Sequence, residues 1–152
     1  MAIKSRRIGE QVDRNTLGRI RVLNNSGVAI SKGDILSVTG ASASGGHLTV
    51  ALADSDAGSV RCTGMKLVAD HDIATGSTGI AVDWQILSGV DTTAWATPGV
   101  ADGPVYLVGA GTSGATLDGA ANAGAGNYVA VIGQVLVAGT SGRVLLAPKK
   151  WI

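Results

Sequence analysis

Two short acidic clusters carry the residue types that best suit metal binding. The Asp-His-Asp segment at 70–72 combines an imidazole with two carboxylates, which are ligands of zinc and manganese. Adjacent side chains on an extended segment point to opposite faces, so these three do not converge on one ion without a turn. The Asp-Ser-Asp segment at 54–56 could begin a calcium loop, but Met65 stands where that loop needs a bidentate glutamate. We interpret both clusters as solvated loop carboxylates and expect no metal site.

A glycine pattern at 109–114, Gly-Ala-Gly-Thr-Ser-Gly, matches the GxGxxG signature of dinucleotide-binding loops and follows a predicted strand. The signature also needs a helix at its last glycine and an acidic residue about 20 positions further on. Gly119, Gly124 and Gly126 interrupt any such helix, and no acidic residue follows Asp118. We therefore expect no nucleotide and no other cofactor.

Nucleophilic catalysis lacks its usual partners in this sequence. His47 and His71 are the two histidines, and no Gly-x-Ser-x-Gly elbow is present. The single cysteine, Cys62, has no recognisable partner motif and lies in the apolar-leaning stretch Val60–Val68, which is typical of a buried, inert thiol. We predict that the protein is not an enzyme.

The charged residues are sorted along the chain. Residues 1–32 carry seven Lys or Arg against two acids, residues 33–142 carry two against nine aspartates, and the last ten residues add three basic ones. A basic leader suits phosphate contacts, but aromatic residues that stack on bases are absent from it and the acidic body would repel a polyanion. The pattern favours docking on an acidic protein surface or a neighbouring subunit, and not binding to nucleic acid.

The leader and the other chain end are therefore our candidates for partner contacts. The chain ends in Trp and Ile after two lysines, and exposed apolar groups of this size mark interaction surfaces. A tail folded back onto its own core is the open alternative. The predicted partner-binding residues are Lys4, Arg6, Arg7, Arg14, Arg19, Arg21, Trp151 and Ile152.

Composition indicates which elements position these residues. The chain has 152 residues, enough for one domain, and its 23 glycines are spread so evenly that long helices are excluded. Phe is absent, so the core must consist of small and β-branched side chains. No segment has the length of a signal peptide's apolar region or of a membrane span, and we expect a protein made in a cytoplasm, with no membrane partner.

Between the glycines, apolar residues recur with the period of two that is typical of half-buried strands. Ile80–Ile86 is expected to place its even-numbered residues on one buried face, as is His47–Ala53. Tyr128–Val137 is apolar on both faces and predicts a central, doubly covered strand, followed by a Gly-rich hairpin. The other predicted strands are Arg19–Leu23, Asp34–Val38, Val60–Val68, Pro104–Val108 and Arg143–Ala147.

The predicted fold is all-β, a sandwich or barrel of about eight short strands. Residues 1–18 are expected to form an extended arm and residues 19–152 a single β domain. Residues 109–126 are close to low complexity and predict a long loop, with one short strand near Ala115–Leu117.

Two blocks of sequence resemble a known family. The segment Asn24–Leu36, Asn-Asn-Ser-Gly-Val-Ala-Ile-Ser-Lys-Gly-Asp-Ile-Leu, is similar to the first strand and turn of small tailed-phage head decoration, or capsid cement, proteins. Gly103–Val108 and 126–136 are similar to a second block found in those proteins and in some phage fibre modules. Residues 55–100 carry no such likeness.

The resemblance implies a β-sandwich or barrel, usually trimeric, that sits on the outer capsid surface of a virion. Such proteins bind the major capsid protein and clamp neighbouring capsomers against genome pressure, and no catalytic residues come with the likeness. The alternative is a carbohydrate- or receptor-binding β module of a phage head fibre or tail protein, with Trp84 and Trp95 as candidate sugar platforms.

Overall fold

The computed structural model describes residues 18–43, 46–55, 65–108, 116–121 and 130–148. They form strands joined by turns, and none of them belongs to a helix long and apolar enough to cross a membrane. The predicted all-β class is confirmed. Ten strands replace the eight or so that were expected: β1 (Arg19–Asn24), β2 (Ile35–Ala41), β3 (Leu48–Leu52), β4 (Lys66–Ala69), β5 (Thr78–Val82), β6 (Gln85–Val90), β7 (Pro104–Val108), β8 (Thr116–Asp118), β9 (Ala130–Val137) and β10 (Gly142–Leu146).

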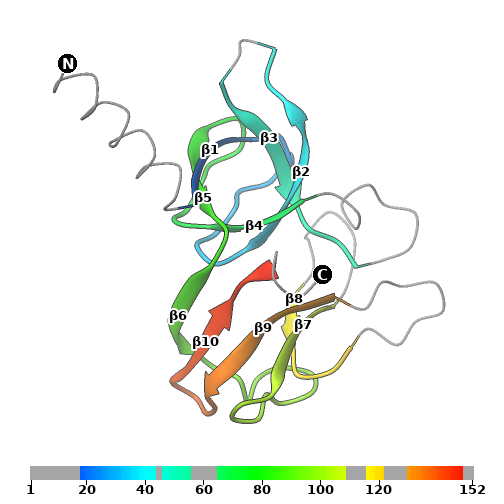
Figure 1. Ribbon diagram of the computed structural model, residues 1–152, viewed down its shortest axis with the longest axis vertical. Coiled ribbons are helices and arrows are strands. Elements are labelled where there is room, and N and C mark those ends of the chain that lie inside the picture. The colour runs from blue at the N-terminus through cyan, green and yellow to red at the C-terminus, as the bar shows by residue number, and fades with distance from the viewer. Residues whose placement is uncertain (1–17, 44–45, 56–64, 109–115, 122–129, 149–152) are drawn as a thin grey trace, which may run out of the picture.

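The strands form two sheets (Figure 1). The first is a closed barrel in the order β1-β3-β2-β4-β5, in which β1 and β3 are parallel and the other pairs antiparallel. The second is a curled antiparallel sheet in the order β6-β10-β9-β7-β8, drawn below the barrel. The predicted strands therefore exist, although β4 starts only at Lys66 and residues 56–64 lie outside the described ones.

Two apolar clusters form the core, and strands of the barrel contribute to both. In β2, Leu36 points into the barrel, while Ile35 packs in the cluster shared with β7, β9 and β10 of the second sheet. In β4, likewise, Leu67 points into the barrel and Val68 packs in the shared cluster. Each such fully buried side chain contributes roughly 1.5–3 kcal/mol, so the outer wall of the barrel and the inner face of the second sheet stabilise each other.

The predicted strand over Ile80–Ile86 is wrong in one respect. The chain bends at Asp83, where it leaves the barrel and enters the second sheet, so β5 and β6 are separate strands. The residues that face the core change there from Val82 in β5 to Leu87 in β6. Trp84 and Ile86, expected on the buried face, are 53% and 49% exposed. By contrast, the predicted face of β3 is confirmed, because its even-numbered leucines and valine pack inside the barrel.

The predicted strand over Tyr128–Val137 is central, as expected, but it is not covered on both faces. Two bulges interrupt β9, since Ile132 is skipped in the pairing with β7 and Leu136 in the pairing with β10. The bulges bring Ile132 and Val135 into the same core cluster. They leave Leu136 and Val137 at 37% and 40% exposure on the outer face.

The Asn-x-Ser-Gly segment begins at Asn24, the last residue of β1, and the buried side-chain amide of Asn24 organises it. Asn24 donates from Nδ2 to the carbonyl oxygens of Val28 (2.8 Å) and Ile73 (3.0 Å). Its Oδ1 accepts the N–H (3.0 Å) and the hydroxyl (2.6 Å) of Ser26. A fully buried amide with all of these bonds made ties the end of β1 to the loop before β5.

The Gly-Asp turn before β2 lies where the barrel contacts the second sheet. Gly33 has a φ of +87°, which favours glycine, and Leu87 of β6 lies so close that a Cβ at position 33 would be 2.5 Å from its Cδ1. The Oδ2 atom of Asp34 accepts the N–H of Ser31 at 2.8 Å and closes the turn. With any other residue at position 33, Leu87 would have to move from its place against the turn.

We predict that Gly33→Ala destabilises the protein more than Gly27→Ala. Both glycines have positive φ values, +87° and +81°, so alanine at either position costs about 1–2 kcal/mol. An added Cβ at position 27 meets no described atom within 4 Å, whereas at position 33 it overlaps Leu87, which adds about 1–3 kcal/mol. Urea denaturation measures both losses in the free energy of unfolding, and equal losses would contradict the proposed fit to Leu87.

Candidate interaction surfaces

Two of the eight predicted partner-binding residues lie among the residues that the structure describes. Arg19 and Arg21 lie on the outer face of β1, where both are exposed, while Val22 points into the barrel. The predictions on Lys4, Arg6, Arg7, Arg14, Trp151 and Ile152 concern residues outside the described ones.

Arg19 is linked to the start of β6 through a single carboxylate. Its Nη2 atom lies 3.1 Å from Oδ2 of Asp70, and the other carboxylate oxygen accepts the side-chain amide of Gln85 at 3.3 Å. The two partners of the ion pair are 57% and 30% exposed, so the pair contributes only about 0.2–1 kcal/mol. Arg21 has no ion pair among the described residues, and its positive charge faces solvent.

The Asp-His-Asp segment at 70–72 serves three different neighbours. Besides the contacts of Asp70, the Nε2 atom of His71 accepts the N–H of Ile80 at 3.1 Å, so Nδ1 carries the proton and donates to the carbonyl oxygen of Asp72 at 2.8 Å. Oδ1 of Asp72 accepts the N–H of Lys32 at 2.8 Å. Among the described residues, no group of His, Cys, Asp or Glu side chains is arranged to hold a metal ion.

The prediction of solvated carboxylates at 54–56 is wrong for Asp54. Its relative exposure is 4%, and Ser55 beside it is also buried. The reason lies in the preceding residue, since the N–H of Ala53 donates to the carbonyl oxygen of Ile35 at 2.8 Å and holds this segment at the junction of the two sheets. Asp56 lies outside the described residues.

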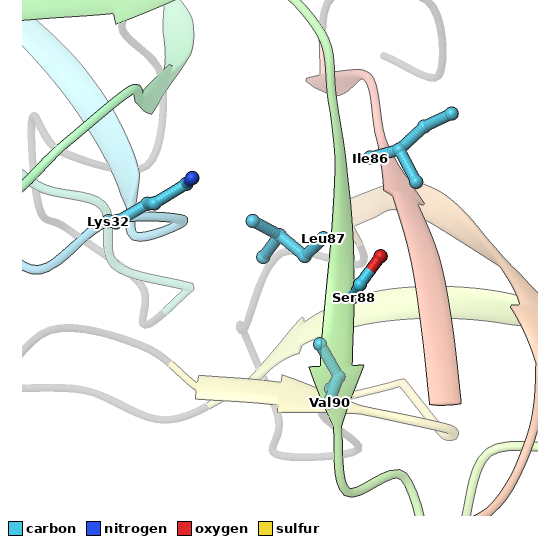
Figure 2. Close-up of a pocket in the computed structure, with 5 residues that line it drawn as sticks. All are labelled: Lys32, Ile86, Leu87, Ser88 and Val90. Atoms are coloured by element: carbon cyan, nitrogen blue, oxygen red, sulfur yellow. The ribbon is translucent and has the colours of Figure 1, made fainter. Parts of the chain in front are cut away.

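An open groove runs between the barrel and the second sheet. One part of it, about 420 Å³ in volume, is bordered by Lys32 and by Ile86, Leu87, Ser88 and Val90 of β6. Figure 2 shows Lys32 and Leu87 pointing toward each other, while Ile86 points away on the other side of β6. An adjoining part of about 330 Å³ shares Lys32 and Leu87 and is also bordered by Gly33, Asp34, Ile35, Trp95, Thr116 and Leu117.

The two candidate sugar platforms do not lie in one groove. Trp95 borders the second part of the groove, but it is half-buried and packs on the core beside Gly99, where an added Cβ would be 2.8 Å from the indole ring. Trp84 lies just before β6, is largely exposed and borders neither part. Trp95 shares its part of the groove with one acidic residue, Asp34, which is the arrangement that the carbohydrate alternative requires.

Sequence reasoning did not single out Lys32 or the groove. Lys32 contributes to the basic N-terminal charge, but its position over β6 follows from the Gly33 turn and from the order of strands in the second sheet. Neither the spacing of apolar residues nor the charge pattern predicts the order of strands in the second sheet.

Two aspartates in turns have pKa values shifted in opposite directions from the usual 3.8. Burial raises the pKa of Asp34, the hydrogen bond from Ser31 opposes this rise, and the negative charge of Asp72 adds to it. In the turn after β6, a 2.6 Å hydrogen bond from the Thr93 hydroxyl lowers the pKa of Asp91. Further bonds from the N–H groups of Thr93 and Ala94 act in the same direction.

We predict opposite pH dependences for Asp34→Asn and Asp91→Asn. The folded state holds the Asp34 proton more tightly than the unfolded chain does. The stability that protonated Asp34 contributes to the fold is therefore lost as pH rises from 3.8 through the folded pKa of Asp34. The stability that Asp91 contributes is present above 3.8 and is lost as pH falls through its folded pKa. Between about pH 2.5 and about pH 7, Asp34→Asn should gain stability relative to the parent as pH rises, and Asp91→Asn should lose it. Denaturant unfolding at each pH tests this, and parallel trends would contradict the assignment.

Comparison of the chain with models of protein families, with curated proteins and with solved structures finds no match.

Proposed function

We propose that this chain is a non-enzymatic virion structural protein that decorates the outer capsid surface of a tailed phage and stabilises it, with the major capsid protein as its partner. The observation that carries the proposal is the position of the basic residues. Residues 1–17 join the body at β1, whose outer face presents Arg19 and Arg21. The positive charge of the leader therefore continues onto the barrel wall.

A basic segment of this kind suits an acidic shell surface. The leader alone carries Lys4, Arg6, Arg7 and Arg14 against two acids. An extended arm loses conformational entropy when it is ordered on a partner, but it covers a large area for its length and gains from opposite charge. The arm and the face of β1 would together form one anchoring surface.

Several carboxylates of the described body accept backbone N–H groups and so fix the shape of turns. This use of carboxylates suits a structural protein. Buried Asp118 accepts the N–H of Thr97 at 3.1 Å and that of Ala120 at 2.9 Å, which ties the long β6–β7 connection to β8. Asp34 and Asp91 act in the same way in their own turns. These contacts fix the loops of a body that projects from a shell.

The proposed oligomer is a homotrimer, as the resemblance to decoration proteins implies, and several copies around one axis would convert weak contacts into avidity. The bulge in β9 exposes Leu136 and Val137 on the outer face of the second sheet, and exposed apolar groups of this kind suit contacts between copies.

Residues 2–18 are predicted to be necessary for capsid binding but not for folding. Their deletion should abolish co-sedimentation with expanded, undecorated shells of the phage that encodes the chain, while the circular dichroism of the β body is retained. Arg21→Glu should weaken binding about tenfold, with a smaller effect as salt rises, because exposed charges act through a screened field. Arg21→Lys, which keeps the positive charge at the same exposed position, is the matched control and should bind like the parent. Undiminished binding by the truncated chain would disprove the anchoring role.

Analytical ultracentrifugation of the free protein tests the trimer. We expect the mass of three chains, and Leu136→Asp should raise the concentration of half-dissociation about tenfold, since it places a charge in an apolar contact. Ala74→Asp, at an exposed turn of the barrel, should leave the mass unchanged. A monomer at every concentration would contradict a trimer formed before docking.

The alternative function, carbohydrate or receptor binding, is favoured by one observation, the position of Trp95 beside Asp34 in the groove. A glycan array distinguishes the two functions. Glycan binding that is lost in Trp95→Phe and kept in Trp84→Ala would favour the alternative, whereas binding to shells without glycan binding favours decoration.

A further inference from the structure

In the described part of the chain, the second sheet ends on one side at the edge strand β6. Among the described residues, β6 pairs only with β10, so one edge of its backbone lacks a neighbouring strand. The opposite edge of the sheet is β8, which has three residues, whereas β6 has six. A long open edge presents N–H and C=O groups that another strand can bind.

The groove beside Lys32 follows this edge. Its 420 Å³ part is bordered both by Leu87, which packs on the core, and by Ile86 and Ser88, which face outward. A hollow bordered by successive residues of one strand, although their side chains point to opposite faces, reaches the backbone between them and therefore follows the strand's edge. Figure 2 shows β10 on one side of β6 and the labelled side chain of Lys32 on the other.

Lys32 is held over the groove by a fixed turn. Its N–H donates to Oδ1 of Asp72 at 2.8 Å, and the N–H of Gly33 donates to the carbonyl oxygen of Ala69 at 2.9 Å. The same turn seats Leu87 against Gly33. The ammonium group is exposed and makes no ion pair with any described residue. The groove thus combines a backbone edge, an apolar side chain and one unpaired positive charge.

We propose that the open edge of β6 binds an extended segment of a partner protein as an added strand, with an acidic side chain of that segment paired to Lys32. Main-chain hydrogen bonds to β6 would supply affinity, and the alternation of side chains would supply specificity. Successive residues of an added strand point to opposite faces, so an acidic residue at Lys32 places its neighbours two positions away toward Leu87 and Val90. The recognised segment therefore alternates, with an acidic residue between apolar ones.

This inference does not depend on the proposed role on a capsid. It rests on the pairing of β6 and on the turn that carries Lys32. A competing account is that Lys32 protects an open edge from pairing with other chains, which is a common use of lysine at sheet edges.

Peptide selection tests the proposal with the full chain as bait. A displayed library of random peptides about ten residues long, the upper length of common strands, should yield binders with the alternating acidic and apolar pattern. A synthetic peptide with the selected sequence should bind Lys32→Glu at least about tenfold more weakly than the parent chain, and Lys32→Arg, the matched control that keeps the charge, as well as the parent. Replacing the acidic residue of the peptide by lysine should reverse the preference, so that Lys32→Glu becomes the better binder.

Amide hydrogen exchange locates the site independently of charge. On peptide binding, protection should rise at amides of β6 and not in β8. An absence of binders, equal binding by Lys32→Glu, or protection confined to other strands would overturn the proposal. Protection of β6 that depends on the concentration of the free protein would also overturn it, since a second copy would then occupy the edge.

Discussion

The structure depends on the apolar contact between the outer wall of the barrel and the inner face of the second sheet. Ile35, Val68 and Val82 of the barrel lie in the same cluster as the inner residues of β7, β9 and β10. The strands that supply them fill the barrel with their alternate residues, so β4, the start of β2 and the end of β5 are buried on both faces. Because the chain has no Phe, small and branched side chains make this contact, and Leu87 lies close to the backbone of Gly33.

Many polar side chains in the described part of the chain hold this framework in place. Asn24 bonds four groups around the loop after β1, while Asp34 and Asp118 accept backbone N–H groups in their turns. The Asn, Ser, Gly and Asp residues at positions 24–34 are therefore needed to build the turns before β2. A turn-forming segment of this kind indicates the fold, whereas the binding of a partner depends on the exposed surfaces.

The sequence predicts the strands well and their environments less well. Where a strand stays in one sheet, the period of two gives the buried face, as with Val50 and Leu52 of β3. It fails at Trp84 and Ile86, because the chain changes sheets at Asp83, and at Leu136, because a bulge shifts the pleat. Apolar spacing shows which residues prefer burial, but sheet order decides which of them are covered. For the same reason β6 could not be recognised as an edge strand from the sequence.

The two proposed surfaces are joined through one carboxylate. Asp70 accepts Arg19 of β1 on one oxygen and Gln85, the first residue of β6, on the other, so the basic face and the open edge are neighbours. Their physics differs. Exposed arginines attract a partner through a field that salt screens, which acts mainly on the association rate, whereas a strand paired to β6 is held by short hydrogen bonds that act mainly on the lifetime of the complex. One partner that contacts both surfaces would be steered by the first and retained by the second.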